Sequence, residues 1–423
     1  GHRRRAADGA GARGDACRIV IGRLAILADD LTGAADTGAA FAAAGRRTVV
    51  LLSPDASAPP TADVLVLTSE SRALAPEAAA EATRHCARRI AAWREGDDGV
   101  RVYKKIDSTL RGHPAIELEA LMDTLSERTA LVAPAFPAQG RTTVGGRQYV
   151  HGVPIEQTTF GQADTTSDLR AVFLRAADGA MAVLSRDDLR QGREHLAGRV
   201  AQERGVRLWL ADAEDDADLA LLAGAALASP LRVLCGSAGL ARAIALAGAS
   251  RQASSPARVS WQDGPVLVVA GSRHPATAAQ VDALQRRGAV VVRPDVSSIE
   301  HDDPSGAAQT ITRVVDALAS SPSVVLSTTG LPDLSAAPVV VAARLASLVA
   351  AVCARVRVGG LVLTGGDTAS AVCQALGCGS LWLTGERQPG IATATLIGGR
   401  HPDLPIVTKA GGFGDASALS LEP

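Results

Sequence analysis

The feature that most constrains the fold is an alternation, repeated along nearly the whole chain, of short apolar runs with alanine-rich stretches of helical character. Most of the apolar runs end in a cluster of polar residues, as buried strands do where they leave a sheet. Strands that alternate with helices are typical of a mostly parallel sheet covered on both faces. The sequence therefore predicts an α/β fold with two domains, each a mostly parallel sheet flanked by helices.

The apolar runs form two series separated by a polar stretch. The first series predicts buried strands at residues 24–28, 48–52, 64–68, 100–104, 131–133, 182–184, 207–210 and 232–235. The second series predicts strands at residues 266–270, 289–293, 324–327, 360–364, 381–383 and 406–408. Residues 250–263, rich in Ser, Gln, Pro and Arg, are predicted to link a first domain at 23–249 to a second at 264–423.

Residues 1–22 are rich in Arg, Gly and Ala and lack a sustained apolar period, so we predict a disordered extension there. Gly9, Gly11 and Gly14 spell a GxGxxG pattern in this stretch. No strand precedes these glycines and no helix convincingly follows, so the pattern does not indicate dinucleotide binding.

The composition excludes several classes of protein. Aromatic residues make up only 3% and the net charge is -1, so the chain lacks the stacking surfaces and the basic surface of a nucleic-acid-binding protein. No apolar run reaches the roughly 18–20 residues that span a membrane. The six cysteines show no CxxC spacing and predict reduced thiols in a cytoplasmic protein. A homo-oligomer remains open.

Lysine is rare in this chain and confined to polar segments. Only three of the 43 Lys+Arg residues are lysine, and Lys104 and Lys105 open a run to residue 112 that also holds Asp107 and Arg111. An ammonium is a compact point charge whereas a guanidinium is a planar fork, so a tight anion site can require lysine. We predict that Lys105 contacts an anionic substrate, that Lys104 flanks it, and that Asp107 is an acceptor or base.

Two adjacent carboxylates, Asp29 and Asp30, directly follow the predicted strand at residues 24–28. Carboxylates at the carboxyl end of a strand can accept hydrogen bonds from a polyol or hold a cation through water. The alternative is a helix N-cap, but one aspartate suffices for a cap. With Arg72 and Arg141 in further polar clusters, the first domain is predicted to receive a small, oxygen-rich anion.

In the second domain the segments that follow predicted strands are glycine-rich turns, whereas in the first domain they carry charged residues. The turns follow predicted strands and contain Ser272, Gly365, Gly366, Asp367, Thr368, Gly411 and Gly412. Glycines allow backbone N–H groups to approach phosphate oxygens, and a helix N-terminus favours negative charge. These turns predict a nucleotide site. The chain has no P-loop, protein-kinase, HExxH or GxSxG motif, and its histidines lack the spacing of metal ligands.

In combination these segments resemble the four-carbon acid sugar kinase family, which includes D-threonate, D-erythronate and 3-oxo-tetronate kinases. The resemblance rests on residues 27–38, 103–112, 137–142, 364–368 and 409–414 and extends from about residue 24 to the end. The family pattern shows Asn where this asparagine-free chain has Ala35, His113 and Gly412, which puts side-chain contacts at those positions in doubt.

The resemblance implies an ATP-dependent kinase that phosphorylates the terminal (4-) hydroxyl of a four-carbon sugar acid, with D-threonate or D-erythronate favoured over 3-oxo-tetronate. The implied sugar-acid contacts are Asp29, Asp30, Arg72, Lys105, Asp107 and Arg141. The implied ATP contacts are Ser272, Gly365, Gly366, Asp367, Thr368, Gly411 and Gly412.

In such a kinase an aspartate would receive the hydroxyl proton, and we predict Asp30 or Asp107. Mg²⁺ would bridge the ATP phosphates, with no metal ligands assigned; Asp367 could bind it through water or only shape its loop. Two rival interpretations are a nicotinamide-dependent oxidoreductase, which should show GxGxxG in context, and a non-catalytic sugar-acid sensor, which predicts binding without ADP release.

Overall fold

The computed structural model of the chain describes residues 21–249 and 259–419, apart from positions 54, 57–58, 60, 98, 162–164 and 178–179. The predicted disordered extension at 1–22 and the predicted linker at 250–263 lie mostly outside the described residues. The predicted α/β class, with mostly parallel strands flanked by helices, is confirmed.

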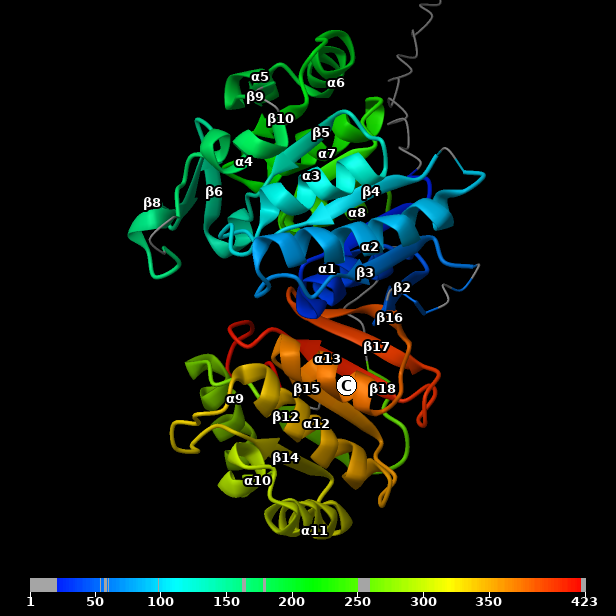
Figure 1. Cartoon of the computed structure of the whole chain (residues 1–423), viewed down its shortest axis with the longest axis vertical. Helices are drawn as coiled ribbons and strands as arrows, with labels where there is room; N and C mark the ends of the chain where they lie inside the picture. The colour runs from blue at the N-terminus through cyan, green and yellow to red at the C-terminus, as the bar shows by residue number, and fades with distance from the viewer. Residues whose placement is uncertain are drawn as a thin grey trace, which may run out of the picture.

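The first series of strands forms an all-parallel arrangement in the upper half of Figure 1. In spatial order these strands are β2 (Thr48–Leu51), β3 (Val64–Thr68), β1 (Leu24–Ala28), β4 (Arg101–Lys105), β11 (Val233–Gly236), β5 (Ala130–Ala133), β10 (Leu208–Ala211) and β9 (Met181–Leu184). Every strand predicted in this series forms, most with an end shifted by one residue.

The second series forms the lower half. Its parallel strands are, in spatial order, β13 (Val290–Val292), β14 (Ser323–Ser327), β12 (Val266–Ala270), β15 (Gly360–Thr364) and β18 (Pro405–Lys409). A hairpin of β16 (Ser380–Gln388) and β17 (Ile391–Ile397) continues the sheet with antiparallel pairing. The strand β17 is not predicted by the sequence, because its alternation of Ala and Thr lacks a clear apolar run.

The two halves share one sheet, which the sequence pattern does not reveal. Strand β16 pairs antiparallel with β2, so that Leu383 lies opposite Thr48 and Ser380 opposite Leu51. The described residues thereby form a continuous sheet of 15 strands. In Figure 1 the hairpin lies directly beneath β2, at the junction of the halves.

Helices cover both faces of this sheet. Those of the first half are α1 (Leu31–Ala43), α2 (Pro76–Arg94), α3 (Pro114–Thr124), α4 (Leu169–Ala177), α5 (Arg186–Arg190), α6 (Arg193–Gln202), α7 (Asp216–Ala228) and α8 (Ala238–Ala247). Those of the second half are α9 (Pro275–Arg286), α10 (Val296–Glu300), α11 (Pro304–Ser320), α12 (Pro338–Cys353) and α13 (Gly366–Ala375). None of the described helices is long and apolar enough to span a bilayer.

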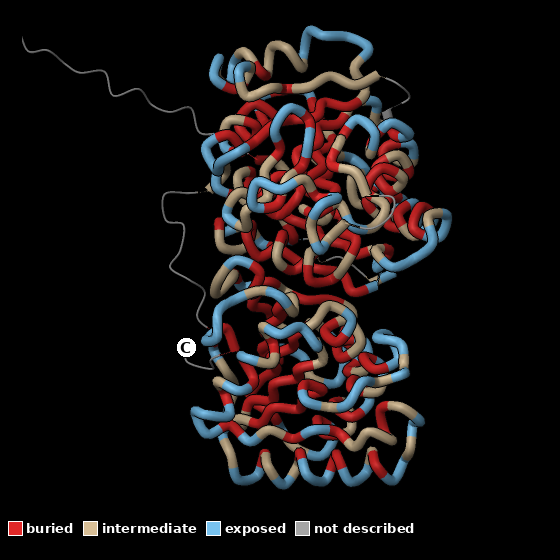
Figure 2. The backbone as a smooth tube through the Cα atoms, turned by 90° about the vertical axis from the view of Figure 1, so that its left-hand side faces the viewer, coloured by how far each residue is buried: buried red, intermediate tan, exposed pale blue. Residues whose placement is uncertain are grey.

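Alternate residues of each strand enter different cores, as the period of a strand requires. In β1, Leu24 and Ile26 join a cluster that extends through both halves, whereas Ala25 and Leu27 join a cluster on the opposite face. Figure 2 shows buried backbone running through both halves. A core shared in this way fixes the position of one half relative to the other.

A second, smaller sheet projects from the first half. It consists of β6 (Arg141–Val144), β7 (Arg147–Val150) and β8 (Val153–Pro154), and it lies between two single-turn helices, η1 (Pro137–Gln139) and η2 (Ile155–Gln157). The sequence does not predict these strands because they are short and carry few apolar residues. They position Arg141 beside the carboxyl ends of the main sheet.

Candidate active site

The predicted sugar-acid residues gather where three neighbouring strands end. Strands β3, β1 and β4 are adjacent and parallel, so the residues that follow them meet at one edge of the sheet. Asp29 and Asp30 follow β1, Arg72 follows β3, and Lys105 ends β4. The backbone N–H of Arg72 donates to the carbonyl of Asp29, which ties the two loops together.

Arg72 binds both aspartates with its planar fork. Its Nε and Nη2 donate to Asp29 at 2.7 and 2.8 Å, and its Nη1 and Nη2 donate to Asp30 at 2.8 Å each. Burial opposes ionisation of Asp29, but Arg72, Lys105 and Lys104 outweigh it and lower the pKa of this carboxyl. Charge-assisted, bidentate contacts of this kind fix geometry as well as charge.

Asp30 is also the N-cap of α1. Its Oδ1 accepts a hydrogen bond from the N–H of Gly33 at 3.0 Å, and its Oδ2 accepts one from the Thr32 hydroxyl at 2.7 Å. The N-cap alternative that the sequence left open is therefore realised in Asp30, and a contact of the aspartates with a polyol or cation stays a prediction. The cap fixes the orientation of the Asp30 carboxylate, which also accepts hydrogen bonds from Arg72.

The two adjacent lysines point to opposite sides of β4. Lys104 is fully buried and pairs with Glu117 of α3 at 2.6 Å. Lys105 is also buried, but within the described part of the chain its ammonium makes no hydrogen bond or ion pair. A methyl group added at Gly33 would lie 3.1 Å from Lys105 Nζ, which places this ammonium beside the first turn of α1. Lys105 is thus a buried cation available to an anion.

Asp107 belongs to a second network. Arg111 donates to it through Nε at 2.7 Å and Nη2 at 3.0 Å, and the Thr109 hydroxyl donates as well. Burial would raise the pKa of Asp107, but Arg111, Arg72 and Thr109 outweigh it and lower the pKa far below its usual value. This carboxylate is therefore a good acceptor of hydrogen bonds and a weak base.

Arg141 approaches this network from the small sheet. The guanidinium groups of Arg111 and Arg141 each lie 5.7 Å from the ring centre of Phe160. Arg141 Nη1 donates to the Gln139 carbonyl, whereas its buried Nε has no partner among the described residues. Burial lowers the pKa of this group. An unpartnered buried N–H is a donor that a bound anion would satisfy.

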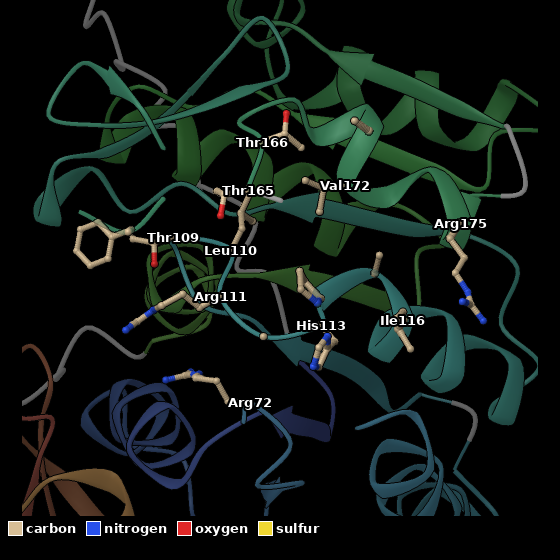
Figure 3. Close-up of a pocket in the computed structure, with 15 residues that line it drawn as sticks. Arg72, Thr109, Leu110, Arg111, His113, Ile116, Thr165, Thr166, Val172 and Arg175 are labelled. Carbon is tan, nitrogen blue, oxygen red and sulfur yellow. The ribbon is translucent and has the colours of Figure 1, made fainter. Parts of the chain in front are cut away.

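A cavity of about 780 Å³ is lined by Arg72 and Arg111. Of the predicted sugar-acid residues Arg72 alone lines it; the others are Asp29, Asp30, Lys105, Asp107 and Arg141. Figure 3 shows Arg72 below the cavity, Arg111 to one side of it and His113 and Arg175 farther along. Gly112 also lines the cavity, together with the apolar side chains of Ile116 and Val172.

Six of the seven predicted nucleotide residues line one cavity of about 460 Å³ in the second half: Ser272, Gly365, Gly366, Asp367, Thr368 and Gly411. They follow the neighbouring parallel strands β12, β15 and β18. Gly365, the N-cap of α13, has a φ of 103°, a conformation that favours glycine. Gly412, the seventh, packs against the His274 ring.

Lys409 organises the glycine loop from within. Its Nζ donates to the carbonyls of Ala410, Gly411 and Phe413 at 2.9, 3.0 and 3.1 Å. Burial lowers the pKa of this ammonium to about 8. Since all three donors of an ammonium are used, Lys409 supports the loop and does not offer a free hydrogen bond to a ligand.

Helix α1, which follows Asp30, contacts helix α13 of the second half. A methyl group added at Gly366, the first residue of α13, would lie 3.5 Å from the Thr32 hydroxyl and 3.8 Å from Asp30 Oδ2. The N-terminus of α13 therefore abuts the carboxylate end of the first site. A ligand group at that N-terminus would lie beside a ligand held by Asp30 and Arg72.

Four residues at this edge are absent from the predicted set: Glu70, Thr109, Arg111 and Phe160. Thr109 and Arg111 lie in the polar run that begins at Lys104, so their segment was signalled by sequence. Glu70 stands between two serines after β3, and Phe160 lies in a loop; no motif marks either residue.

The described residues contain no group of three His, Cys, Asp or Glu that could hold a metal ion. In many kinases Mg²⁺ is held mainly by the nucleotide phosphates and water, with few protein ligands. The described side chains fit Mg²⁺ bound in that way. The backbone cradle around Gly365 and Gly411 fits the phosphates themselves.

Two family models match the chain. Residues 24–244 match a sugar-binding N-terminal domain, and residues 267–419 match a nucleotide-binding C-terminal domain. The crystal structure of a Haemophilus influenzae protein, from a family described as a domain of unknown function, superposes with a TM-score of 0.75 at 23% identity, over 94% of this chain and 98% of that one. That likeness shows the fold.

Relatives with assigned activities align along nearly the whole chain. A D-threonate kinase of Salmonella typhimurium is 36% identical over 94% of this chain and 96% of its own length. A D-erythronate kinase of Heliobacterium modesticaldum is 31% identical over 94% of this chain and 95% of its own. Neither rival interpretation, the oxidoreductase or the sensor, is supported by these relatives. The chain belongs to the four-carbon acid sugar kinase family.

Proposed function

We propose that this protein transfers the γ-phosphoryl group of ATP to the terminal (4-) hydroxyl of D-threonate, with D-erythronate as the second candidate and 3-oxo-tetronate as the third. The observation that carries the proposal is that Thr32 and Asp30 lie close to Gly366, so that the proposed nucleotide cradle is beside the proposed anion site. The greater identity to the D-threonate kinase than to the D-erythronate kinase supports the order of the acids.

The charges of the first half suggest how the acid binds. Lys105, which lacks an ion pair within the described residues, and Arg141, whose Nε lacks a partner there, are the cations open to a carboxylate. The oxygens of Asp29, Asp30 and Asp107 accept hydrogen bonds, as the hydroxyl groups of a sugar acid require. Arg72 holds two of these aspartates in place and so orients the hydroxyls.

The second cavity suggests how ATP binds. One side is formed by Gly365, Gly366 and Thr368 at the start of α13, where the helix dipole favours phosphate. The other side is apolar, with Leu334 and Val341, and suits an adenine ring. In this orientation the γ-phosphate points along α13 toward Asp30. Mg²⁺, bound chiefly to the phosphates, would neutralise the charge that develops on them.

ADP release with ATP and a panel of acids tests the proposal. D-threonate should give the highest kcat/KM, above D-erythronate and 3-oxo-tetronate, and ³¹P NMR should show the product phosphorylated at the terminal oxygen. Omission of Mg²⁺ should abolish turnover. The proposal fails if none of the acids stimulates ADP release, or if NADH and not ATP raises the Tm.

Two further parts of the proposal concern the protein as a whole. Five cysteines lie in the described part of the chain and all five are free and buried, which supports a reducing compartment, the cytoplasm. Alkylation of the protein under native and denaturing conditions tests their burial, and light scattering tests for a homo-oligomer.

A further inference from the structure

Glu70 lies in the loop that joins β3 to Arg72 and has an unusual backbone conformation. Its φ is 47°, in the left-handed region that a residue with a Cβ rarely adopts. The flanking residues hold it there: the N–H groups of Ser69 and Ser71 donate to the carbonyls of Ala28 and Asp29 at 2.9 and 3.0 Å. Strain maintained in this way is common at functional sites, where it aims a side chain that the regular backbone would direct elsewhere.

The Glu70 side chain lies at the junction of the two halves. Its Oε1 accepts a hydrogen bond from the Thr68 hydroxyl at 2.8 Å. The charged groups that act on it are Asp30 at the start of α1, Asp367 in the first turn of α13, and Arg72 on its own loop. Glu70 is therefore near Asp30, which belongs to the proposed sugar-acid site, and near α13, whose N-terminus would hold the ATP phosphates.

Glu70 differs from the three aspartates of the sugar-acid site because no arginine binds it. The oxygens of Asp29 and Asp30 accept from Arg72, and those of Asp107 accept from Arg111. Within the described residues, Glu70 has no ion pair. A carboxylate with a free lone pair can accept a proton, whereas a carboxylate held by a guanidinium is stabilised in its charged form.

The surroundings of Glu70 also favour protonation. The crowding of protein around it, together with Asp30 and Asp367, raises its pKa to about 7, although the Thr68 hydroxyl and Arg72 oppose the rise. The protein partly desolvates the carboxyl group, but the residue as a whole remains exposed, so water can carry a proton away. The nearby Cys86 thiol of α2 has a pKa raised to about 12 by burial and carries no charge at neutral pH.

We propose, on the basis of the function proposed above, that Glu70 is the general base that takes the proton from the terminal hydroxyl of the sugar acid. As the hydroxyl oxygen forms its bond to the γ-phosphorus, the O–H bond breaks and the proton passes to a Glu70 oxygen. The bond from the γ-phosphorus to the bridging oxygen breaks, and ADP leaves with that electron pair. Glu70 then releases the proton to solvent. Asp30 and Asp107, the residues predicted for this role from sequence, orient the substrate.

The first test is Glu70→Gln, which keeps the shape of the side chain and removes the base. With D-threonate and ATP, kcat should fall by about 10²- to 10⁴-fold, the usual contribution of a general base. The Kd values of D-threonate and ATP, measured separately by calorimetry, should change by less than about threefold. The matched control is Glu95→Gln, an exposed glutamate at the end of α2, which should leave kcat unchanged.

The second test is the pH profile of kcat, which a purely structural role would not move. The wild type should show a rising limb with an apparent pKa near 7, and Glu70→Gln should lose this limb. Thr68→Val removes the hydrogen bond that lowers the Glu70 pKa, so its limb should shift to higher pH while activity at high pH is retained. Glu70→Asp should keep a limb with a reduced kcat.

The outcomes separate this proposal from the function on which it rests. If the wild type releases no ADP with any of the acids, the proposed function fails. If the wild type is active and Glu70→Gln keeps both its kcat and its rising limb, the role of Glu70 is overturned. It is also overturned if excess Mg²⁺ restores full turnover to Glu70→Gln, because that result assigns the carboxylate to the metal, or if only Asp30→Asn or Asp107→Asn removes the limb.

Discussion

The two halves of the molecule build their sites from different materials. The first half uses charged side chains: one arginine holds two aspartates, another holds Asp107, and Lys105 remains open. The second half lines its site mainly with backbone groups of glycine-rich turns. Its lysine, Lys409, donates hydrogen bonds to three backbone carbonyls. Side-chain charges read the pattern of oxygens on a small acid, whereas a backbone cradle receives the phosphates that every ATP molecule presents. We therefore propose that substrate specificity resides in the first half, which matches a sugar-binding domain.

Among the tests of this difference between the halves, the largest effect is expected for Lys105→Met, which removes the open cation. The kcat/KM for the sugar acid should fall by about 100- to 1000-fold, since the loss of one partner of a buried charged contact costs about 2–5 kcal/mol. The Kd of ATP should stay within about twofold. Steady-state kinetics and calorimetry measure the two quantities, and Arg190→Met, which removes an exposed cation, is the control. Equal losses of acid and ATP binding would contradict the division between the halves.

A smaller effect is expected for Gly411→Ala, and it should reduce ATP binding and not sugar-acid binding. The added methyl group would lie 2.1 Å from Ser272 Oγ and 2.9 Å from its Cβ, so the cradle must shift. The Kd of ATP should rise by about tenfold, from a cost of about 1–2 kcal/mol, while binding of D-threonate is retained. In the control Gly379→Ala the new methyl group would meet Ala56 Cβ at an ordinary 3.8 Å. Unchanged ATP affinity in Gly411→Ala would show that the cradle does not touch the nucleotide.

The smallest effect concerns the pH dependence of stability that Lys409 contributes. Its pKa is about 8 when folded and near 10.4 in an unfolded chain, so the unfolded state binds more protons between these values. Relative to Lys409→Met, the free energy of unfolding of the wild type should rise from pH 8 to pH 10 by at most about 1.4 kcal/mol per pH unit. Urea unfolding at each pH measures this difference. A fall in this difference over the same pH range would contradict the lowered pKa. It would mean that the three hydrogen bonds stabilise the charged ammonium more than burial destabilises it.

The sequence predicts the two halves unequally well. The strand ends and the glycine turns of the second half are local features, and most of the predicted nucleotide residues do line one cavity. In the first half the sequence predicts the segments but not the partners. The pairing of Arg72 with both aspartates depends on the order β3, β1, β4, and the contact of Asp107 with Arg111 spans a loop in which Leu110 has a φ of 59°.

The sequence does not predict a role for Glu70 either, because its surroundings also come from segments that are distant in the sequence. Its neighbours Asp30 and Asp367 lie at the starts of α1 and α13, which are far apart in the sequence and contact each other where the sheets of the two halves are joined. The same pairing explains why β17 was missed: its residues are weakly apolar, and its place is determined by strands on both sides of it. The proposed roles of the individual site residues remain predictions until they are tested.

The pairing of β2 with β16 also has a consequence for biosynthesis. The ribosome completes β2 more than 300 residues before it makes the strand that covers its edge. Throughout that interval one edge of the apolar strand β2 (Thr48–Leu51) in the nascent N-terminal half has no partner strand and is open to pairing with other chains. A fragment that stops at the predicted linker should therefore aggregate where the full chain does not, and chaperones that bind exposed strand edges should associate with the fragment.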